Sequence, residues 1–199
     1  MRPTRHNSSV MEQAHTHQRR FDLPLCWPDP PLSVVLVEPE IPPNTGNIAR
    51  LCAATGSPLH LVGPLGFRLH DRALRRAGVD YWDAVNVQRH MHFAAFLDAQ
   101  PARCWFFSTR GRRAHWDVDY HAGDALVFGS ESSGLSDELL DEWPEQILQI
   151  PMRTDLVRSL NLANSVAIAL YEALRQLGAP ACGERSTQRN KEAEFRKDI

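Results

Sequence analysis

Three short segments of this chain are rich in asparagine, serine and glycine, and each follows residues that predict a buried strand. Small polar side chains and accessible backbone groups can hold a ligand, and glycine allows close approach. The segments are residues 44–50, residues 128–135, and residues 150–152 with 158–165. Ligands of an open parallel sheet bind beyond the carboxyl ends of its strands. We therefore expect one binding site at that edge of an α/β sheet.

The first segment predicts a helix N-terminus. Pro42 and Pro43 make a stiff approach to it, and Asn44 is a plausible cap. The free backbone N–H groups of such an end can hold an anion such as a nucleic-acid phosphate. Arg50 lies six residues further on, and its long side chain can reach back to form one patch with Asn44. Taken alone, an asparagine cap and an exposed helical arginine are also common structural features.

The second and third segments each leave a structural alternative open. Residues 129–134 could be a strand-to-helix turn in which Glu131 accepts from local backbone donors, and residues 158–161 could cap the helix that follows. Neither the dinucleotide pattern Gly-x-Gly-x-x-Gly nor a phosphate loop ending in Gly-Lys-Ser/Thr is present there. A nicotinamide- or ATP-dependent enzyme is therefore disfavoured.

The elements that must position these segments alternate between strand and helix. Short apolar runs predict buried strands at residues 34–37, 59–62, 84–87, 104–108, 125–128 and 147–150. Helical spacing of apolar residues predicts helices around residues 48–55, ended by Gly56, around residues 93–97, and over residues 162–177, ended by Gly178. Such alternation predicts an α/β fold with a mostly parallel sheet and helices on both faces.

The composition predicts one domain with two tails. The chain has 199 residues and a formal net charge of only -2, so an RNA partner would need a local basic patch. Residues 1–31 are polar and then rich in proline, and we interpret them as a flexible extension. Residues 32–178 form the predicted domain. Residues 179–199 are charged and weakly apolar, which indicates a flexible tail.

The sequence also predicts that the protein has neither a structural metal nor a membrane span. Its four cysteines form no Cys-x-x-Cys pair or Cys/His ligand cluster, so we expect no structural metal and a reducing cytosolic setting. No apolar run approaches the length of a membrane span, and we expect no membrane association.

Two arginine clusters, residues 68–76 and 110–113, are candidate RNA-binding patches or simply solvated surfaces.

Together with their flanks, the three segments resemble the SPOUT superfamily of RNA methyltransferases, and within it the TrmL-type tRNA (cytidine/uridine-34) 2'-O-methyltransferases. The resemblance covers about residues 33–177. Its most specific parts are residues 37–53, which read VEPEIPPNTGNIARLCA, and residues 74–81, which read LRRAGVDY.

The resemblance implies a deep trefoil knot in the C-terminal third of the domain, whose loops bind the methyl donor S-adenosylmethionine. It also implies a homodimer that forms through the last helix, with each site completed by the neighbouring subunit. The matching cofactor positions are Phe107, Ser108, Gly129, Ile150 and Ser159.

For the reaction, the resemblance implies 2'-O-methylation of the wobble nucleotide of tRNA, with leucine isoacceptors as expected substrates. We expect Arg50 to orient the ribose and stabilise developing negative charge while Asn44 and Ser159 fix the hydroxyl. The candidates for binding the anticodon stem-loop are Arg75, Arg76 and Arg112.

Three other functions compete with this interpretation. A related 2'-O-methyltransferase could act on another tRNA position or on ribosomal RNA, and the residues themselves do not separate these substrates. A knotted dimer that binds RNA without catalysis is disfavoured by the presence of Asn44, Arg50, Gly129 and Ser159. A dinucleotide-dependent oxidoreductase is a distant third.

Overall fold

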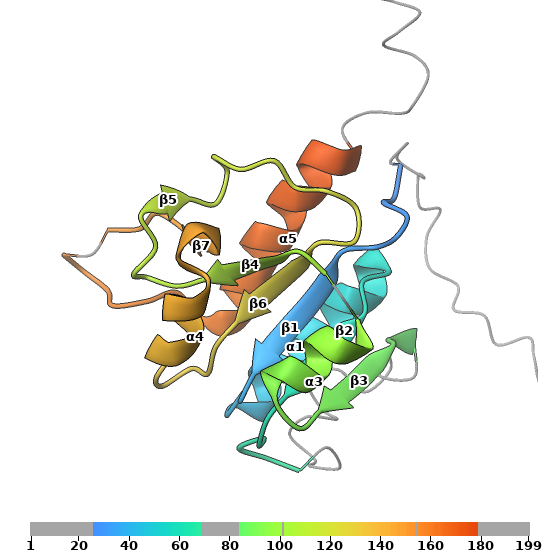
Figure 1. Ribbon diagram of the computed structural model, residues 1–199, viewed down its shortest axis with the longest axis horizontal. Helices are drawn as coiled ribbons and strands as arrows, with labels where there is room; N and C mark the ends of the chain where they lie inside the picture. Colours follow the sequence, from blue (N-terminus) through green and yellow to red (C-terminus); the bar gives the residue numbers. More distant parts are fainter. Residues whose placement is uncertain (1–25, 69–83, 101, 154, 179–199) are drawn as a thin grey trace, which may run out of the picture.

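A seven-stranded parallel sheet forms the centre of the protein in a computed structural model that describes residues 26–68, 84–100, 102–153 and 155–178. The strand order is β3-β2-β1-β6-β4-β7-β5, and every neighbouring pair is parallel (Figure 1). The predicted α/β class with a parallel sheet is confirmed. Because all strands run the same way, the segments that follow them meet at one edge of the sheet.

Continuous apolar runs explain the central strands, which are buried on both faces. The strands are β1 (Ser33–Val37), β2 (Leu59–Val62), β3 (Val87–His90), β4 (Cys104–Phe107), β5 (Arg113–Ala114), β6 (Ala125–Phe128) and β7 (Ile147–Gln149). In β2, β4 and β6 every residue is buried.

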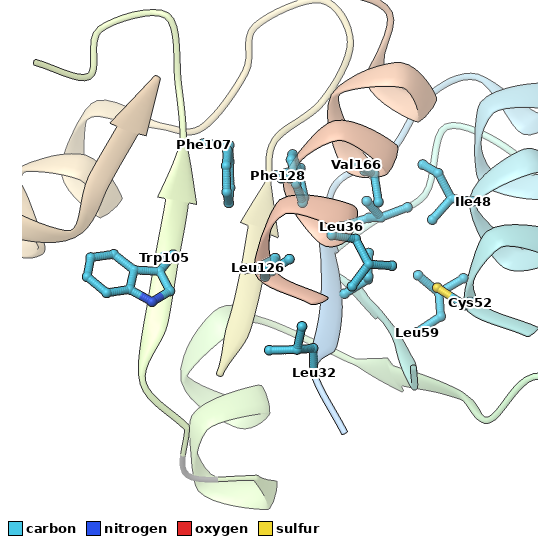
Figure 2. Close-up of a cluster of buried hydrophobic side chains, with 14 of the residues drawn as sticks. Leu32, Leu36, Ile48, Cys52, Leu59, Trp105, Phe107, Leu126, Phe128 and Val166 are labelled. Atoms are coloured by element: carbon cyan, nitrogen blue, oxygen red, sulfur yellow. The ribbon is translucent and has the colours of Figure 1, made fainter. Parts of the chain in front are cut away.

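Helices cover both faces of this sheet, as predicted (Figure 1). On one face, α1 (Pro42–Thr55) and α5 (Leu162–Gly178) contribute Ile48 and Val166 to a core with Leu36 and Leu126 (Figure 2). On the other, α3 (Phe93–Ala99) and α4 (Asp137–Glu142) contribute Phe96 and Leu140 to a second core. A short 3-10 helix, Pro144–Gln146, leads into β7. The apolar stripe expected along the last helix is buried in the first core.

The edge strands differ from the sequence prediction. Residues 84–87 were expected to form a strand, but β3 begins only at Val87, which pairs with Leu59, and continues through polar residues to His90. This edge strand is only half-buried, so it lacks the apolar run that marks a central strand. The two-residue β5 and the short α4, whose only buried residue is Leu140, gave no periodic signal and were missed.

The ends of α1 correct one expectation and confirm another. Asn44 is not the N-cap, because the helix already begins at Pro42 and Ile41 occupies the cap position without a side-chain hydrogen bond. Proline is favoured in the first helical turn, where its missing N–H has no partner to lose. At the other end Gly56 adopts a left-handed φ of 70° and ends the helix, as predicted.

Some sequence predictions lie outside the described residues. They include a flexible character for residues 1–25 and 179–199, and the anticodon contacts of Arg75 and Arg76. Among the described helices, none is long and apolar enough to cross a membrane. The described ranges also contain no group of three or more histidine, cysteine, aspartate or glutamate residues arranged to hold a metal ion.

A buried histidine pair predicts acid sensitivity. His60 is fully buried in β2, its Nδ1 lies 3.0 Å from Nε2 of His90, and its ring meets the edge of Phe96. Burial, with a smaller contribution from His90, lowers the pKa of His60 to about 4. Because the unfolded chain binds this proton more readily, His60 favours the folded state above pH 6.5, and that advantage is lost as the pH falls towards 4.

We expect His60→Leu to flatten the decline of the free energy of unfolding between pH 6.5 and 4. Urea unfolding of the variant and the wild type at pH 7, 5.5 and 4.5 measures this difference. The matched control is His92→Leu, because His92 is an exposed residue that only caps α3. Parallel pH profiles for His60→Leu and the wild type would show that His60 contributes nothing to the acid sensitivity.

Candidate active site

One cavity of about 730 Å³ opens at the carboxyl edge of the sheet, where β4, β6 and β7 end and α1 and α5 begin. All three polar segments contribute to its wall. The predicted site residues that line it are Asn44, Phe107, Ser108, Gly129, Ile150 and Ser159. The structure therefore brings together, from distant parts of the chain, the five expected cofactor positions and two of the three expected catalytic residues, Asn44 and Ser159, of which Ser159 was expected in both roles.

Two stacked aromatic rings support the inner wall. Phe107 ends β4 and Phe128 ends β6, their ring centroids are 4.6 Å apart, and the ring planes lie within 13° of parallel (Figure 2). Both are almost completely buried. Because aromatic rings pack rigidly, they fix the positions at which the chain leaves these two strands. The next residues, Ser108 and Gly129, line the cavity.

The loop after β6 is folded tightly back on itself and requires glycine at its start. Ser130 and Gly134 form an antiparallel bridge, in which the Ser130 N–H donates to the Gly134 oxygen and the Gly134 N–H donates to the Ser130 oxygen. A Cβ atom on Gly129 would lie 2.0 Å from the Gly134 carbonyl carbon. The missing side chain thus allows the backbone itself to form the cavity wall.

Glu131 joins this loop to the start of α1. Its Oε2 accepts from the Glu40 N–H at 2.8 Å, and its Oε1 accepts from the Asn44 side-chain amide at 2.8 Å and from the Ile41 N–H at 3.3 Å. In return, the Glu40 carboxylate accepts from the N–H and hydroxyl of Ser132. The carboxylate also suits the positive end of the helix dipole. Glu131 therefore holds two of the polar segments together.

Asn44 and Asn161 extend this link to the third segment. The Asn161 side-chain amide donates to the Asn44 side-chain oxygen at 2.9 Å. The Asn161 side-chain oxygen accepts from the Ala163 and Asn164 N–H groups, so Asn161 caps α5. For residues 158–161, the structure therefore assigns the cap to Asn161. A chain of hydrogen bonds from Glu131 through Asn44 to Asn161 fixes the relative positions of all three cavity segments.

We expect Glu131→Gln to lower the free energy of unfolding by about 1–3 kcal/mol, because an amide nitrogen would face the Glu40 N–H or the Asn44 amide without accepting from it. Chemical denaturation at pH 7 measures the change. The control is Glu142→Gln at the end of α4, an exposed glutamate to which the structure gives no hydrogen bond with a described residue. Equal stability of both variants would contradict a structural role for the Glu131 carboxylate.

Two of the expected functional residues, the catalytic candidate Arg50 and the RNA-binding candidate Arg112, lie elsewhere. Arg50 is exposed on α1 and does not line the cavity of its own chain. Arg50 lies six positions after Asn44, which corresponds to a rise of about 9 Å along the helix and separates it from the buried Asn44. The expected shared patch of these two residues is therefore not formed at this cavity. Arg112 is also exposed and outside the lining.

Sequence reasoning named Arg110 in an arginine cluster, and Glu131 and Arg158 in the polar segments, but did not place their side chains at one cavity. Glu131 was considered only for local donors, although its partners lie about 90 residues away. Arg110 and Asp137 both line the cavity and form an ion pair. Arg158 lines it as well. For Glu131 and Arg158, the only indication in the sequence was that both lie in the polar segments identified above.

Comparison with known proteins decides the family. A sequence profile of the SpoU rRNA Methylase family matches residues 31–171, which include every strand of the sheet and most of α5. The chain belongs to the SpoU rRNA Methylase family. The resemblance to RNA methyltransferases that the sequence motifs carry is thereby confirmed.

Relatives of this SpoU family member are similar over nearly their whole length. A Yersinia pestis protein named tRNA (cytidine(34)-2'-O)-methyltransferase is 51% identical over 156 residues, which cover 75% of this chain and 96% of the relative. A solved structure described as giving insights into the 2-OH methylation of C/U34 on tRNA superposes with a TM-score of 0.70 at 51% identity, covering 73% of this chain and 95% of the other.

A structure with lower sequence identity was solved with AdoMet bound. The AdoMet-bound rRNA methyltransferase from Sinorhizobium meliloti matches with a TM-score of 0.66 at 28% identity, covering 73% of this chain and 56% of the other. The parallel α/β sheet is thus shared with enzymes that differ in the RNA they are named for.

Proposed function

We propose that this protein transfers the methyl group of S-adenosylmethionine to the 2'-hydroxyl of the wobble nucleotide, C or U at position 34, of tRNA. The observation that carries the proposal is its 51% identity with a tRNA (cytidine(34)-2'-O)-methyltransferase across 96% of that relative. The cavity at the sheet edge supports it, because its volume falls within the usual range for small-molecule sites. Leucine isoacceptors are the proposed substrates.

The residues of the cavity fit the methyl donor. Because Gly129 has no side chain, the cofactor can approach its backbone closely. Apolar and polar surface around it is offered by Phe107, Ser108, Ile150 and Ser159. These five residues would hold S-adenosylmethionine, which supplies an electrophilic methyl group on a sulfonium. We also propose that the chain segments around them form the trefoil knot implied by the resemblance.

The chain's own residues must then position the ribose hydroxyl and stabilise negative charge as its proton leaves. We propose that Asn44 and Ser159 hold the hydroxyl, because both line the cavity. A guanidinium stays protonated, so Arg50 acts by orienting the ribose and stabilising developing charge rather than as a base.

A homodimer reconciles this role with the position of Arg50. Because Arg50 lies outside the cavity of its own chain, we propose that it reaches the cavity of the partner subunit. The proposed interface is α5, on which Ile168 and Tyr171 remain 40% and 54% exposed. Large apolar side chains in such positions are typical of protein–protein contacts.

The remaining assignments concern RNA binding and location. We propose that Arg75, Arg76 and Arg112 contact the phosphates of the anticodon stem-loop. Residues 32–178 are the proposed methyltransferase domain, with residues 1–31 and 179–199 as extensions. The proposed location is the cytoplasm, because that is where tRNA serves translation.

Methyl transfer from labelled S-adenosylmethionine tests the proposed function. Total unmodified tRNA, individual leucine tRNA transcripts and ribosomal RNA are offered separately. Incorporation into leucine tRNAs and not into ribosomal RNA supports the proposal. Incorporation into ribosomal RNA alone contradicts it, and so does binding of S-adenosylmethionine and tRNA with no transfer to any RNA, which would indicate a non-catalytic RNA-binding dimer.

A further inference from the structure

Arg158 occupies the mouth of the cavity. It lies in the segment between β7 and α5 and lines the cavity with an exposed side chain. The two preceding residues, Leu156 and Val157, are 70% and 48% exposed, so this part of the segment faces solvent. A ligand that enters the cavity from outside therefore meets Arg158 at the rim.

Among the charged residues that line this cavity, Arg158 is the one to which the structure gives no partner in the described residues. Arg110 and Asp137 neutralise one another in an ion pair. The Glu131 carboxylate accepts hydrogen bonds from three donors. Within the described residues, the structure gives Arg158 neither an ion pair nor a hydrogen bond. The rim thus presents one guanidinium whose donors are available to an anion.

A phosphodiester is the anion that suits this position. The planar guanidinium donates two parallel hydrogen bonds to phosphate oxygens. Arg158 directly precedes Ser159, and adjacent Cα atoms are about 3.8 Å apart. If Ser159 holds the 2'-hydroxyl, the phosphate on the neighbouring 3' carbon of the same ribose is within reach of the long Arg158 side chain. Its exposure to solvent suits an incoming RNA, and the binding measurements below separate this ligand from the carboxylate of the cofactor.

We propose that Arg158 binds an RNA phosphate next to the target ribose and so positions that ribose over the cavity. This inference rests on the proposed function for the identity of the RNA. It assigns to Arg158 a positioning role that is separate from the charge stabilisation proposed for Arg50.

The test compares Arg158→Ala with Arg158→Lys. Arg153→Ala is the matched control, because Arg153 is an exposed arginine of the same segment that pairs with Asp155 and does not line the cavity. Steady-state kinetics give the KM for tRNA, and calorimetry gives the affinity for S-adenosylmethionine. Binding of unmodified tRNA at several salt concentrations gives the number of phosphate contacts.

We expect Arg158→Ala to raise the KM for tRNA about tenfold, the loss typical of one charged hydrogen-bonded contact. The slope of log affinity against log salt should shrink by about 0.7–0.9, the value of one phosphate contact. Arg158→Lys should keep the wild-type salt slope while losing part of the affinity, since it keeps the charge but not the fork. Affinity for S-adenosylmethionine should stay unchanged in all three variants.

Two results would overturn the inference. Weaker binding of S-adenosylmethionine by Arg158→Ala, with unchanged tRNA binding, would assign the guanidinium to the cofactor carboxylate. Identical behaviour of Arg158→Ala and Arg153→Ala would show that no phosphate is bound. A wild-type protein that binds tRNA without methylating it would count against the proposed function alone, because the salt slopes of the variants would still decide the role of Arg158.

Discussion

Arg50→Ala is expected to lower kcat for methyl transfer by about 100- to 1,000-fold, the loss typical of removing one donor that stabilises developing negative charge. Affinity for S-adenosylmethionine should not change, because Arg50 is not among the five cavity residues proposed to hold it. Arg50→Lys should also be strongly impaired, since a point charge does not reproduce the planar guanidinium. Single-turnover kinetics with saturating tRNA measure the chemical step. Full activity of Arg50→Lys would contradict this role.

Subunit mixing tests whether Arg50 acts across the dimer. Ser159→Trp is a suitable partner variant, because Ser159 is an exposed rim residue and a bulky side chain there would fill the cavity. In a mixed dimer, the Arg50→Ala subunit keeps an open cavity and the Ser159→Trp subunit supplies Arg50. We expect two inactive variants to regain activity after subunit exchange. If Arg50 serves its own cavity, mixing restores nothing.

Gly129→Ala is expected to abolish measurable binding of S-adenosylmethionine. Its Cβ atom would lie 2.0 Å from the Gly134 carbonyl carbon and 2.2 Å from the Leu135 nitrogen, both of which are backbone atoms. The loop must therefore move, which displaces the cavity wall. Overpacking of this kind also lowers the free energy of unfolding by about 1–3 kcal/mol. Calorimetric titration and chemical denaturation measure the two effects separately.

Gly56→Ala separates steric conflict from the general cost of substituting glycine. Gly56 ends α1 at a φ of 70°, and no atom lies within 4 Å of its hypothetical Cβ. The left-handed conformation alone should cost about 1–2 kcal/mol. Because Gly56 does not line the cavity, Gly56→Ala should leave the affinity for S-adenosylmethionine unchanged.

If Gly129→Ala binds S-adenosylmethionine as tightly as the wild type, the loop after β6 does not form the cofactor site.

The central fold could be predicted because burial on both faces of a parallel sheet leaves continuous apolar runs, as in β4 and β6. The convergence of the three polar segments was predictable for a related reason: parallel strands bring their carboxyl ends to one edge. The edge strands were harder, because β3 continues through polar residues and β5 is only two residues long.

The interactions within the site could not be predicted, since they join residues far apart in the chain. Glu131 bonds to Asn44 across 87 positions, and Asn161 bonds to Asn44 across 117. Asn44 was interpreted as a helix cap because asparagine favours that position, but the prolines before it start the helix earlier. The Asn44 side chain therefore forms hydrogen bonds between segments instead of capping the helix.

The position of the transferred methyl group tests the central claim most directly. One leucine tRNA transcript carries a normal ribose at nucleotide 34, and a second carries a 2'-deoxyribose there. After reaction with labelled S-adenosylmethionine, nuclease digestion and mass spectrometry locate the methyl group. We predict a single 2'-O-methyl at nucleotide 34 of the first transcript and none in the second. A methyl group at another nucleotide, or equal labelling of both transcripts, would contradict the proposed function.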